Sequence, residues 1–238
     1  MTETDSTNEE VKRRELSSGP LCICADYQTA GRGQKGNSWE SERGKNLLFS
    51  IMLRPENLTV SHQFRLSQCM ALAVSEELGV GSKEPKFQIK IKWPNDIYYG
   101  EKKVCGIVIE TTLSGDRVER CIIGVGINVN QREFLSDAPN PVSLSQIAGH
   151  DFDREELLDS VLERFAYWYG RLQRGEEQEI ARQYVDRLIW NEGLHRYRDA
   201  GGEFEAEFVD VALDGRLTLR DTEGKERRYY FKEVAHVL

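Results

Sequence analysis

The sequence lacks any apolar run long enough to cross a membrane, and it opens with acidic and polar residues (MTETD). A membrane-spanning helix needs about 20 mostly apolar residues. A secretory signal needs a basic start followed by an apolar stretch. Both patterns are missing, as are internal repeats and low-complexity segments. These absences predict a cytoplasmic protein with no membrane partner.

Cysteine is sparse and scattered, which argues against a disulfide framework and against a zinc site. The five cysteines stand at positions 22, 24, 69, 105 and 121, and no two of them form a C-x-x-C pair. Cys22 and Cys24 alternate within the segment 21–25. We therefore expect them to act as small apolar residues on one face of a strand.

Positive charge is in deficit, with 32 lysines and arginines against 40 acidic residues and a formal net charge of -8. A nucleic-acid-binding surface needs the opposite balance, so no nucleic-acid partner is expected. Proline is also scarce, with 6 residues against 20 glycines, and 39% of the chain is apolar. This is an ordinary globular composition, and 238 residues leave room for one large domain and one small one.

The first 190 residues show the patterns of an α+β fold. The turn signal Ser114-Gly115-Asp116 separates two alternating runs and predicts neighbouring antiparallel strands. A capping-box pattern at Thr7 and Glu10 predicts where the first helix begins. The expected helices run from 7 to near 19, over 62–78, from 153 to about 175 and on to about 189, and the expected strands cover 21–26, 46–53, 87–93, 103–111 and 117–129.

After Trp190 the pattern changes to short alternating segments at 203–211, 215–220, 226–231 and 233–238. Glycine-containing turns separate them, as expected of consecutive hairpins. The pattern predicts a small β-barrel, and hence two domains at 1–190 and 191–238.

The segment 31–39 (GRGQKGNSW) joins two expected strands and is rich in glycine. Its three glycines let backbone N–H groups approach an anion closely. Arg32 and Lys35 add positive charge, and Trp39 offers a flat face to an aromatic base. A nucleotide phosphate is a suitable guest, and a solvated glycine loop is the structural alternative.

A second informative segment is 92–96 (KWPND), followed by 103–110 (KVCGIVIE). Asp96 could hold Mg²⁺ or orient a lysine, and Lys103 could neutralise a carboxylate that attacks a phosphate. Gly106 would let a ligand lie against the strand. A hairpin with exposed lysines is the alternative.

In the segment 124–130 (GVGINVN), Gly124 and Gly126 fall on one face of an otherwise β-branched strand. A flat guest could occupy the space that their missing side chains leave. A β-bulge explains the glycines equally well.

The segment 5–8 (DSTN) could simply cap the first helix. It also gathers two hydroxyls and a carboxamide, which can bond a neutral polar ring.

Together these segments resemble one family, the biotin protein ligases, over essentially the whole chain. The family's marks are Asp-Ser-Thr-Asn, a Gly-Arg-Gly loop that ends in Trp, Lys-Trp-Pro-Asn-Asp, Lys-x-x-Gly-Ile-x-x-Glu and Gly-x-Gly-Ile-Asn, and all five are present. The resemblance implies a catalytic domain like that of class II aminoacyl-tRNA synthetases. That domain is a mostly antiparallel sheet flanked by helices, followed by a small Src-homology-3-like barrel.

The resemblance also implies a reaction, the ATP-dependent ligation of biotin to one lysine of a biotin carboxyl carrier domain through biotinyl-5'-AMP. Lys103, Arg32 and Asp96 would be catalytic, with Asp96 serving Mg²⁺. The implied biotin contacts are Ser6, Thr7, Asn8, Gln28, Gly31, Arg32, Lys103, Gly106, Gly124 and Gly126. The implied ATP or adenylate contacts are Arg32, Gly33, Gln34, Lys35, Gly36, Asn37, Trp39, Asn95, Lys103 and Asn128. Because a mixed anhydride reacts with water, the loop 31–45 is expected to act as a lid.

The sequence departs from the family pattern in two places. Many bacterial relatives have arginine where this chain has Gln34 and Asn37, so two positive charges near the phosphate are missing. Only four residues precede Asp5, so we expect the strand that usually leads into this motif to be shortened or lost, and no N-terminal DNA-binding domain.

Two other functions compete with this interpretation. A lipoate protein ligase shares the fold and the adenylation chemistry, but its typical Arg-Arg-x-x-Gly-Gly-Gly run is absent. A biotin-sensing interaction protein without catalysis would not need both Asp96 and Lys103. Edge strands could pair two copies into a homodimer.

Overall fold

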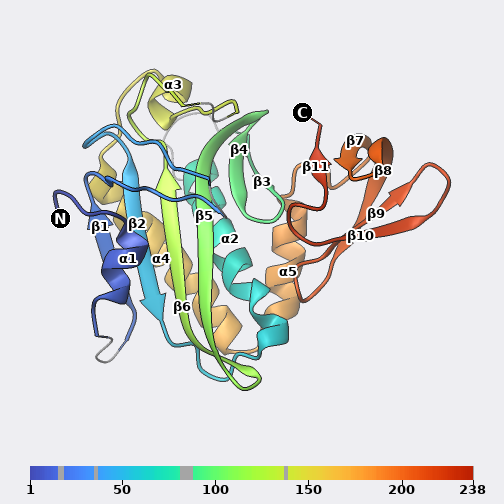
Figure 1. The fold of residues 1–238 in the computed structure, drawn as a ribbon, viewed down its shortest axis with the longest axis horizontal. Coiled ribbons are helices and arrows are strands. Elements are labelled where there is room, and N and C mark those ends of the chain that lie inside the picture. The colour runs from blue at the N-terminus through green and yellow to red at the C-terminus, as the bar shows by residue number, and fades with distance from the viewer. Residues whose placement is uncertain (16–18, 35–36, 81–87, 137–138, 238) are drawn as a thin grey trace.

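A six-stranded antiparallel sheet forms the centre of the computed structural model, which describes residues 1–15, 19–34, 37–80, 88–136 and 139–237 (Figure 1). The strand order is β1-β2-β6-β5-β4-β3, so β1 and β3 lie at the two edges. The strands are β1 (Leu21–Ala25), β2 (Leu47–Leu53), β3 (Ile89–Lys92), β4 (Asp96–Tyr99), β5 (Lys102–Ser114) and β6 (Arg117–Ile127).

Three long helices cover one face of this sheet, and a short helix lies on the other (Figure 1). The covering helices are α2 (Phe64–Val80), α4 (Arg154–Gln173) and α5 (Glu177–Asp186). The short helix α1 (Thr7–Lys12) packs against β1, β2 and β6. Because α1 covers only part of its face, the rest of that face is available for a cleft.

Strand β2 shows how the two faces differ. Leu47, Phe49, Ile51 and Leu53 belong to the main hydrophobic core with α2 and α4. Ser50 falls on the opposite face and is fully buried there. A strand that is covered on both sides reads as a continuous apolar run, which explains why β2 shows little alternation.

The register of the central strands brings small residues together on the cleft face. Gly106 of β5 pairs with Gly126 of β6, and Gly124 pairs with both Ser50 and Val108. Successive side chains of a strand point to opposite faces, so Gly124 and Gly126 lie on one face, as the sequence predicts. Pairing places Gly106 beside them.

The C-terminal part forms a second antiparallel sheet of five strands, in the order β10-β9-β8-β7-β11. Its side chains join the main core through Tyr197 and Leu219, and Trp93 donates a hydrogen bond of 2.9 Å from Nε1 to the carbonyl of Gly215. The strands are β7 (Leu194–Asp199), β8 (Gly202–Val211), β9 (Leu217–Asp221), β10 (Glu226–Tyr229) and β11 (Ala235–His236).

The first helix begins at Thr7 as predicted, but its C-terminal end and its cap differ from the prediction. It ends at Lys12 rather than near Gly19, because the N–H groups of Arg13 and Arg14 bond to carbonyls only three residues back, which tightens and closes the last turn. Residues 16–18 lie outside the described part of the chain. The capping-box prediction was also wrong, since Ser6 is the N-cap and makes no side-chain cap.

The other predictions agree with the structure more closely. Asp153 caps α4 by accepting hydrogen bonds from the N–H groups of Glu155 and Glu156. β5 and β6 form the expected hairpin, with Gly115 at a positive φ of 61°. Four elements were not predicted from the sequence: η1 (Val60–His62), α3 (Leu144–Ala148), β4 and β7. Residue 87, at the start of one predicted strand, and residue 238 lie outside the described residues.

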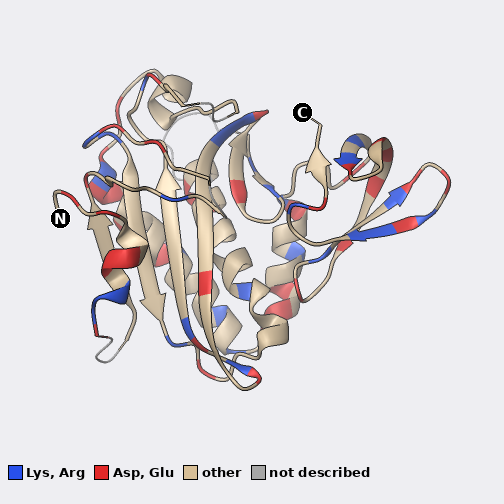
Figure 2. Cartoon of the chain, viewed as in Figure 1, with Lys and Arg blue, Asp and Glu red and all other residues tan. Residues whose placement is uncertain are grey.

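Charged side chains gather at loops and along the C-terminal hairpins, whereas the sheet face beside α1 is mostly uncharged (Figure 2). In the described residues no helix is both long and apolar enough to span a bilayer. Uncharged backbone and small side chains therefore form the floor of the face on which the sequence motifs meet.

Candidate active site

A cleft of about 1360 Å³ lies on the sheet face that carries α1. All four motif segments, which are far apart in the sequence, contribute to its walls. The predicted site residues that line it are Ser6, Thr7, Asn8, Gln28, Arg32, Gly33, Gln34, Asn37, Trp39, Asn95, Asp96, Lys103, Gly106, Gly124, Gly126 and Asn128. Gly31 does not line it, and residues 35 and 36 lie outside the described part of the chain.

The indole of Trp39 lies on the two paired glycines. A Cβ atom at Gly126 would stand 2.5 Å from Cε2 of Trp39, and one at Gly106 would stand 2.8 Å from its Cζ3. Real Cβ contacts are never so short, so any side chain there would displace the ring. Gly106 and Gly126 are therefore a seat for Trp39, and the flat group that the sequence predicts on this face includes the protein's own indole.

A polar cluster forms one end of the cleft. Gln28 Oε1 accepts hydrogen bonds from the backbone N–H and the hydroxyl of Thr7, at 2.7 and 3.0 Å. Ser50 Oγ lies 2.7 Å from Thr7 Oγ1 and 2.6 Å from Asn8 Oδ1. The cluster presents hydroxyl and carboxamide groups, which can bond a neutral ring with both donors and acceptors.

Glu110 fixes the orientation of the Asn8 carboxamide. Asn8 Nδ2 donates to Glu110 Oε1 at 2.7 Å, and Lys12 pairs with the other carboxylate oxygen at 2.7 Å. Burial raises the pKa of Glu110, but the bonds from Lys12 and Asn8 outweigh it and leave the pKa below its usual value. A Cβ at Gly124 would stand 2.2 Å from Asn8 Oδ1, so this glycine makes room for Asn8.

The segment 31–39 folds back on itself over the cleft. The backbone N–H of Trp39 donates to the carbonyl of Gly31 at 3.0 Å, and Arg32 and Ser38 form an isolated antiparallel β-bridge through their backbones. Arg32 is 67% exposed at its side chain and pairs with Glu9 at 3.3 Å. The structure thus places Arg32 at the cleft wall, but paired with α1 rather than with the other catalytic candidates.

Gln34 points into the cleft. Its Nε2 donates to Asn95 Oδ1 and to the carbonyl of Ile107, both at 3.2 Å. Asn95 in turn donates to Ser67 Oγ at 2.9 Å. Gln34 and Asn95, 61 positions apart, are therefore brought together as predicted, and both side chains already have protein partners.

Lys103 and Asp96 form the charged centre of the cleft. Lys103 Nζ donates to Asp96 Oδ2 at 2.7 Å and lies 5.8 Å from the centre of the Trp39 ring. Burial lowers the pKa of the neighbouring Lys92; the charge of Asp96 opposes this shift, and the charge of Lys103 adds to it. The arrangement concentrates positive charge beside a carboxylate, as phosphoryl chemistry requires.

Two buried groups at this centre have no hydrogen-bond partner among the described residues. They are Oδ1 of Asn128 and Nε1 of Trp39. Buried polar atoms are nearly always bonded in folded proteins, so these two mark places where a guest can supply a partner.

Comparison with known proteins identifies the family. The family model described as "Biotin/lipoate A/B protein ligase family" matches residues 1–128. The "Biotin--[acetyl-CoA-carboxylase] ligase" of Paracoccus denitrificans is 35% identical over 231 residues, which cover 95% of each chain. The "Bifunctional ligase/repressor BirA" of Bacillus subtilis is 32% identical over 96% of this chain and 70% of its own.

A solved structure agrees with these sequence relatives. The biotin protein ligase from Aquifex aeolicus in complex with biotin and ATP superposes with a TM-score of 0.81 and 31% identity, and the match covers 99% of this chain and 96% of that one. The chain belongs to the biotin protein ligase family. Its fold, a mixed α+β arrangement of antiparallel sheets and helices, is the biotin protein ligase fold.

Several residues that line the cleft of this biotin protein ligase family member, or bond to its lining, were not predicted as site residues. Ser50 carried a usable signal, because it is the one polar residue in the apolar run 47–53. Glu110 closes the Lys-x-x-Gly-Ile-x-x-Glu motif, yet no role was assigned to it. The C-terminal sheet supplies Asp214, Gly215, Tyr230 and Phe231 to the cleft, and only the tertiary fold brings them there.

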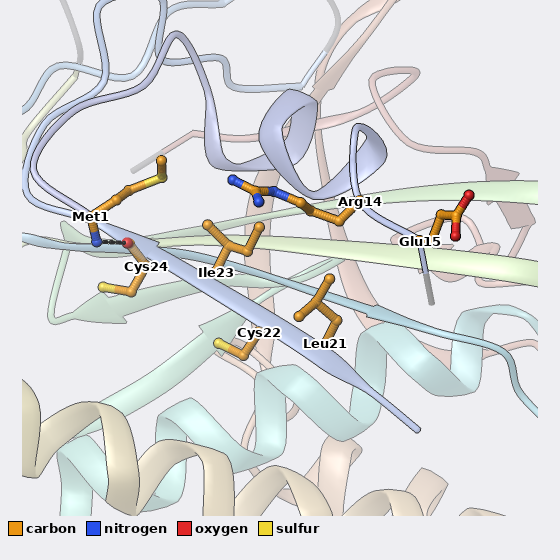
Figure 3. Close-up of a pocket in the computed structure, with 7 residues that line it drawn as sticks. All are labelled: Met1, Arg14, Glu15, Leu21, Cys22, Ile23 and Cys24. Atoms are coloured by element: carbon orange, nitrogen blue, oxygen red, sulfur yellow. Dashed lines mark hydrogen bonds between the residues drawn. The ribbon is translucent and has the colours of Figure 1, made fainter. Parts of the chain in front are cut away.

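A second pocket, of about 480 Å³, lies along the edge strand β1 (Figure 3). The side chains of Cys22 and Cys24 point to one side of the strand there, as the sequence predicts. The N-terminal amine of Met1 donates a hydrogen bond of 2.9 Å to the carbonyl of Cys24. Burial raises the pKa of both thiols, that of Cys22 to about 12. The biotin ligase motifs all lie in the other cleft.

Proposed function

We propose that this chain is an ATP-dependent biotin–protein ligase, which forms biotinyl-5'-AMP and transfers biotin to a lysine of a biotin carboxyl carrier domain. The observation that carries the proposal is one cleft in which a neutral polar cluster and the Lys103–Asp96 pair lie on either side of the Trp39 seat. Relatives named as biotin ligases support it.

The polar cluster would hold the ureido ring of biotin. Ser6, Thr7 and Asn8 are buried at the start of α1, and Gln28 accepts two bonds from Thr7. Ser50 bonds to both Thr7 and Asn8, and Glu110 accepts a bond from Asn8, so the orientations of Thr7 and Asn8 are fixed. A ring with both N–H donors and a carbonyl acceptor can exchange bonds with such a set, whereas a dithiolane ring cannot.

The charged centre would serve adenylation. The biotin carboxylate attacks the α-phosphate of ATP in line, and the bond to pyrophosphate breaks. Negative charge builds on the phosphate oxygens during this step, so the ammonium of Lys103 stabilises the transition state most. Arg32 would leave Glu9 to join it, because the Arg32–Glu9 pair is exposed and weak.

Mg²⁺ fits this site as a companion of the nucleotide. Among the described residues no three His, Cys, Asp or Glu side chains gather into a ligand set. Mg²⁺ typically uses one or two carboxylates together with substrate phosphates, and Asp96 supplies one hard oxygen donor in the cleft. Asp96 would hold the ion, which supplies positive charge to the phosphates.

The transfer of biotin to the acceptor lysine would take place in the same cleft. The amine of an acceptor lysine attacks the acyl carbon of the adenylate, and AMP leaves. Water competes for that carbon, so the indole of Trp39 over the cleft floor would protect the anhydride. The consumption of ATP fits the cytoplasmic location that the sequence predicts.

The finer architectural assignments belong to the same proposal. Residues 1–190 would form a catalytic domain related to class II aminoacyl-tRNA synthetases, supported by its antiparallel sheet with helices on one face. Residues 191–238 would form a Src-homology-3-like barrel, supported by five short antiparallel strands. Homodimer formation through the edge strands stays a prediction.

The test is thermal unfolding together with label transfer. A ligand that binds only the folded state raises stability by about 2.7 kcal/mol at a hundredfold excess over Kd. Biotin should raise Tm, and biotin with MgATP should raise it further, because the adenylate joins two sites in one ligand. Radiolabelled ATP should give biotinyl-5'-AMP, and a carrier domain should then accept the biotin. Stabilisation by lipoate and not by biotin would overturn the proposal.

A further inference from the structure

Glu40 directly follows Trp39 and ties two walls of the cleft together. Its Oε1 accepts a hydrogen bond of 2.8 Å from the backbone N–H of Leu135, and its Oε2 accepts one of 2.8 Å from the N–H of Ser136. The two segments are 95 positions apart in the sequence. A carboxylate that receives two backbone N–H groups holds a strong, directional contact.

Gln131 extends this contact into the buried interior. Its Nε2 donates to Glu40 Oε1 at 3.2 Å, and its Oε1 accepts from Asn46 Nδ2 at 2.6 Å and from the backbone of Glu42 at 2.9 Å. Asn46 and Gln131 are both buried. The carboxylate of Glu40 is thus anchored to the start of β2 as well as to Leu135 and Ser136.

Both tied segments line the cleft. Trp39 contributes from one side and Leu135 and Ser136 from another, and Leu135 is 88% exposed at the rim. Burial raises the pKa of Glu40, but the bonds from Ser136, Leu135 and Gln131 outweigh it, so the pKa lies below its usual value. The carboxylate is therefore charged at neutral pH.

We propose that Glu40 is a positioning residue that retains the reactive adenylate by holding Trp39 and the segment 131–136 in one fixed arrangement. This inference rests on the proposed function. Gln34 gives the cleft a neutral side chain, so part of the retention must come from elsewhere. Glu40 acts through Trp39 and Leu135 and does not touch the reacting atoms.

The test compares Glu40→Gln with the parent and with Glu42→Gln. The glutamine keeps the size of the side chain but turns its NH₂ group toward at least one of the N–H donors, so at least one bond is lost. Glu42 is exposed and takes part through its backbone, which makes its variant a matched control. The measurements are adenylate formation in a single turnover and the dissociation rate of biotinyl-5'-AMP.

We expect Glu40→Gln to release biotinyl-5'-AMP about fivefold faster, a loss moderated by solvent exposure, while the formation rate changes less than about twofold. Glu42→Gln should match the parent in both. Equal dissociation rates for all three proteins would overturn the inference. A parent protein that forms no adenylate would instead overturn the proposed function, so the two failures are distinguishable.

Hydrogen exchange of the full chain gives a second reading that needs no activity. The amides of Leu135 and Ser136 should be protected in the parent, and at least one of them should exchange about tenfold faster in Glu40→Gln, since a broken hydrogen bond exposes its N–H to water. The amide of Trp39, bonded to Gly31, should follow them if the segments are coupled. Unchanged exchange at Leu135 and Ser136 would overturn the inference.

Discussion

Lys103 Nζ stands 2.7 Å from Asp96 Oδ2. The two residues come from the paired strands β4 and β5, whose register shifts between Ile97 and Tyr98. The sequence predicts that Asp96 holds Mg²⁺ or orients a lysine, and that Lys103 neutralises a carboxylate that attacks a phosphate. In the structure each is the partner of the other, so the carboxylate of Asp96 holds the ammonium of Lys103 in place in the cleft. An ammonium has three N–H donors, so Lys103 can keep one bond to Asp96 and still donate to a phosphate oxygen.

Lys103→Ala should lower the rate of adenylate formation about a hundredfold and weaken biotin binding much less, because the lysine acts mainly on charge that develops in the transition state. Single-turnover formation of biotinyl-5'-AMP and calorimetric biotin titration give the two quantities. Lys102→Ala, an exposed neighbour on β5, is the matched control. Equal losses in affinity and rate would show that Lys103 only anchors the ground state.

Gln34→Arg should slow the dissociation of biotinyl-5'-AMP by about tenfold, because a charge-assisted bond replaces a neutral one. Biotinylation of an unrelated lysine-rich protein should fall with it, and the formation rate should change little. Gln34→Met has a side chain of similar size that cannot donate a hydrogen bond. It therefore measures what the bonds to Asn95 and Ile107 contribute in the parent. Identical dissociation rates for parent and Gln34→Arg would mean that other contacts already hold the intermediate.

Gly126→Ala should displace the indole of Trp39 and reduce adenylate formation by about tenfold or more, since the new Cβ would stand 2.5 Å from the ring. In a Trp39→Ala background the same substitution should cost little further activity. The double-mutant cycle measures this coupling. Additive losses in the cycle would show that Gly126 faces something other than Trp39.

His236 makes stability depend on pH. Its ring lies 5.1 Å from Trp190 and 5.2 Å from Tyr197. Burial, with smaller contributions from Lys92 and His195, lowers its pKa to about 3 from a usual 6.5. Between pH 6.5 and pH 3 the unfolded chain therefore binds a proton at His236 and the folded state does not. The contribution of His236 to the free energy of unfolding is complete above pH 6.5 and is lost as the pH falls toward 3.

Unfolding of the parent should thus lose about 1–2 kcal/mol from this residue between pH 7 and pH 5, at about 1.4 kcal/mol for each unit of pKa difference. His236→Phe should lack that loss, so the Tm of the variant relative to that of the parent should be higher at pH 5 than at pH 7. His150→Gln, at an exposed site, should keep the parent's pH dependence. Parallel pH profiles for parent and His236→Phe would contradict the prediction.

Local patterns predicted most of the regular elements, because periodicity and turn residues act over a few positions. The strands 21–26 and 46–53 and the helix after Asp153 appear within a few residues of their expected bounds. The capping box of the first helix was predicted wrongly, since the hydroxyl of Thr7 bonds to Gln28 and Ser50 and does not cap the helix. That competition comes from contacts 21 and 43 positions away, which a local rule does not contain.

The sequence by itself determined the family, the set of motif residues and the charge available for phosphate chemistry, since these depend on residue identity and order alone. The tertiary structure decided which of them meet. Register alone sets Gly106 against Gly126, and so gives Trp39 its seat. Packing of the C-terminal sheet adds Tyr230 and Phe231 to the cleft, and Glu40 reaches Leu135 across the fold. These contacts join residues tens of positions apart, and their energies exist only once the chain has closed the loops between them.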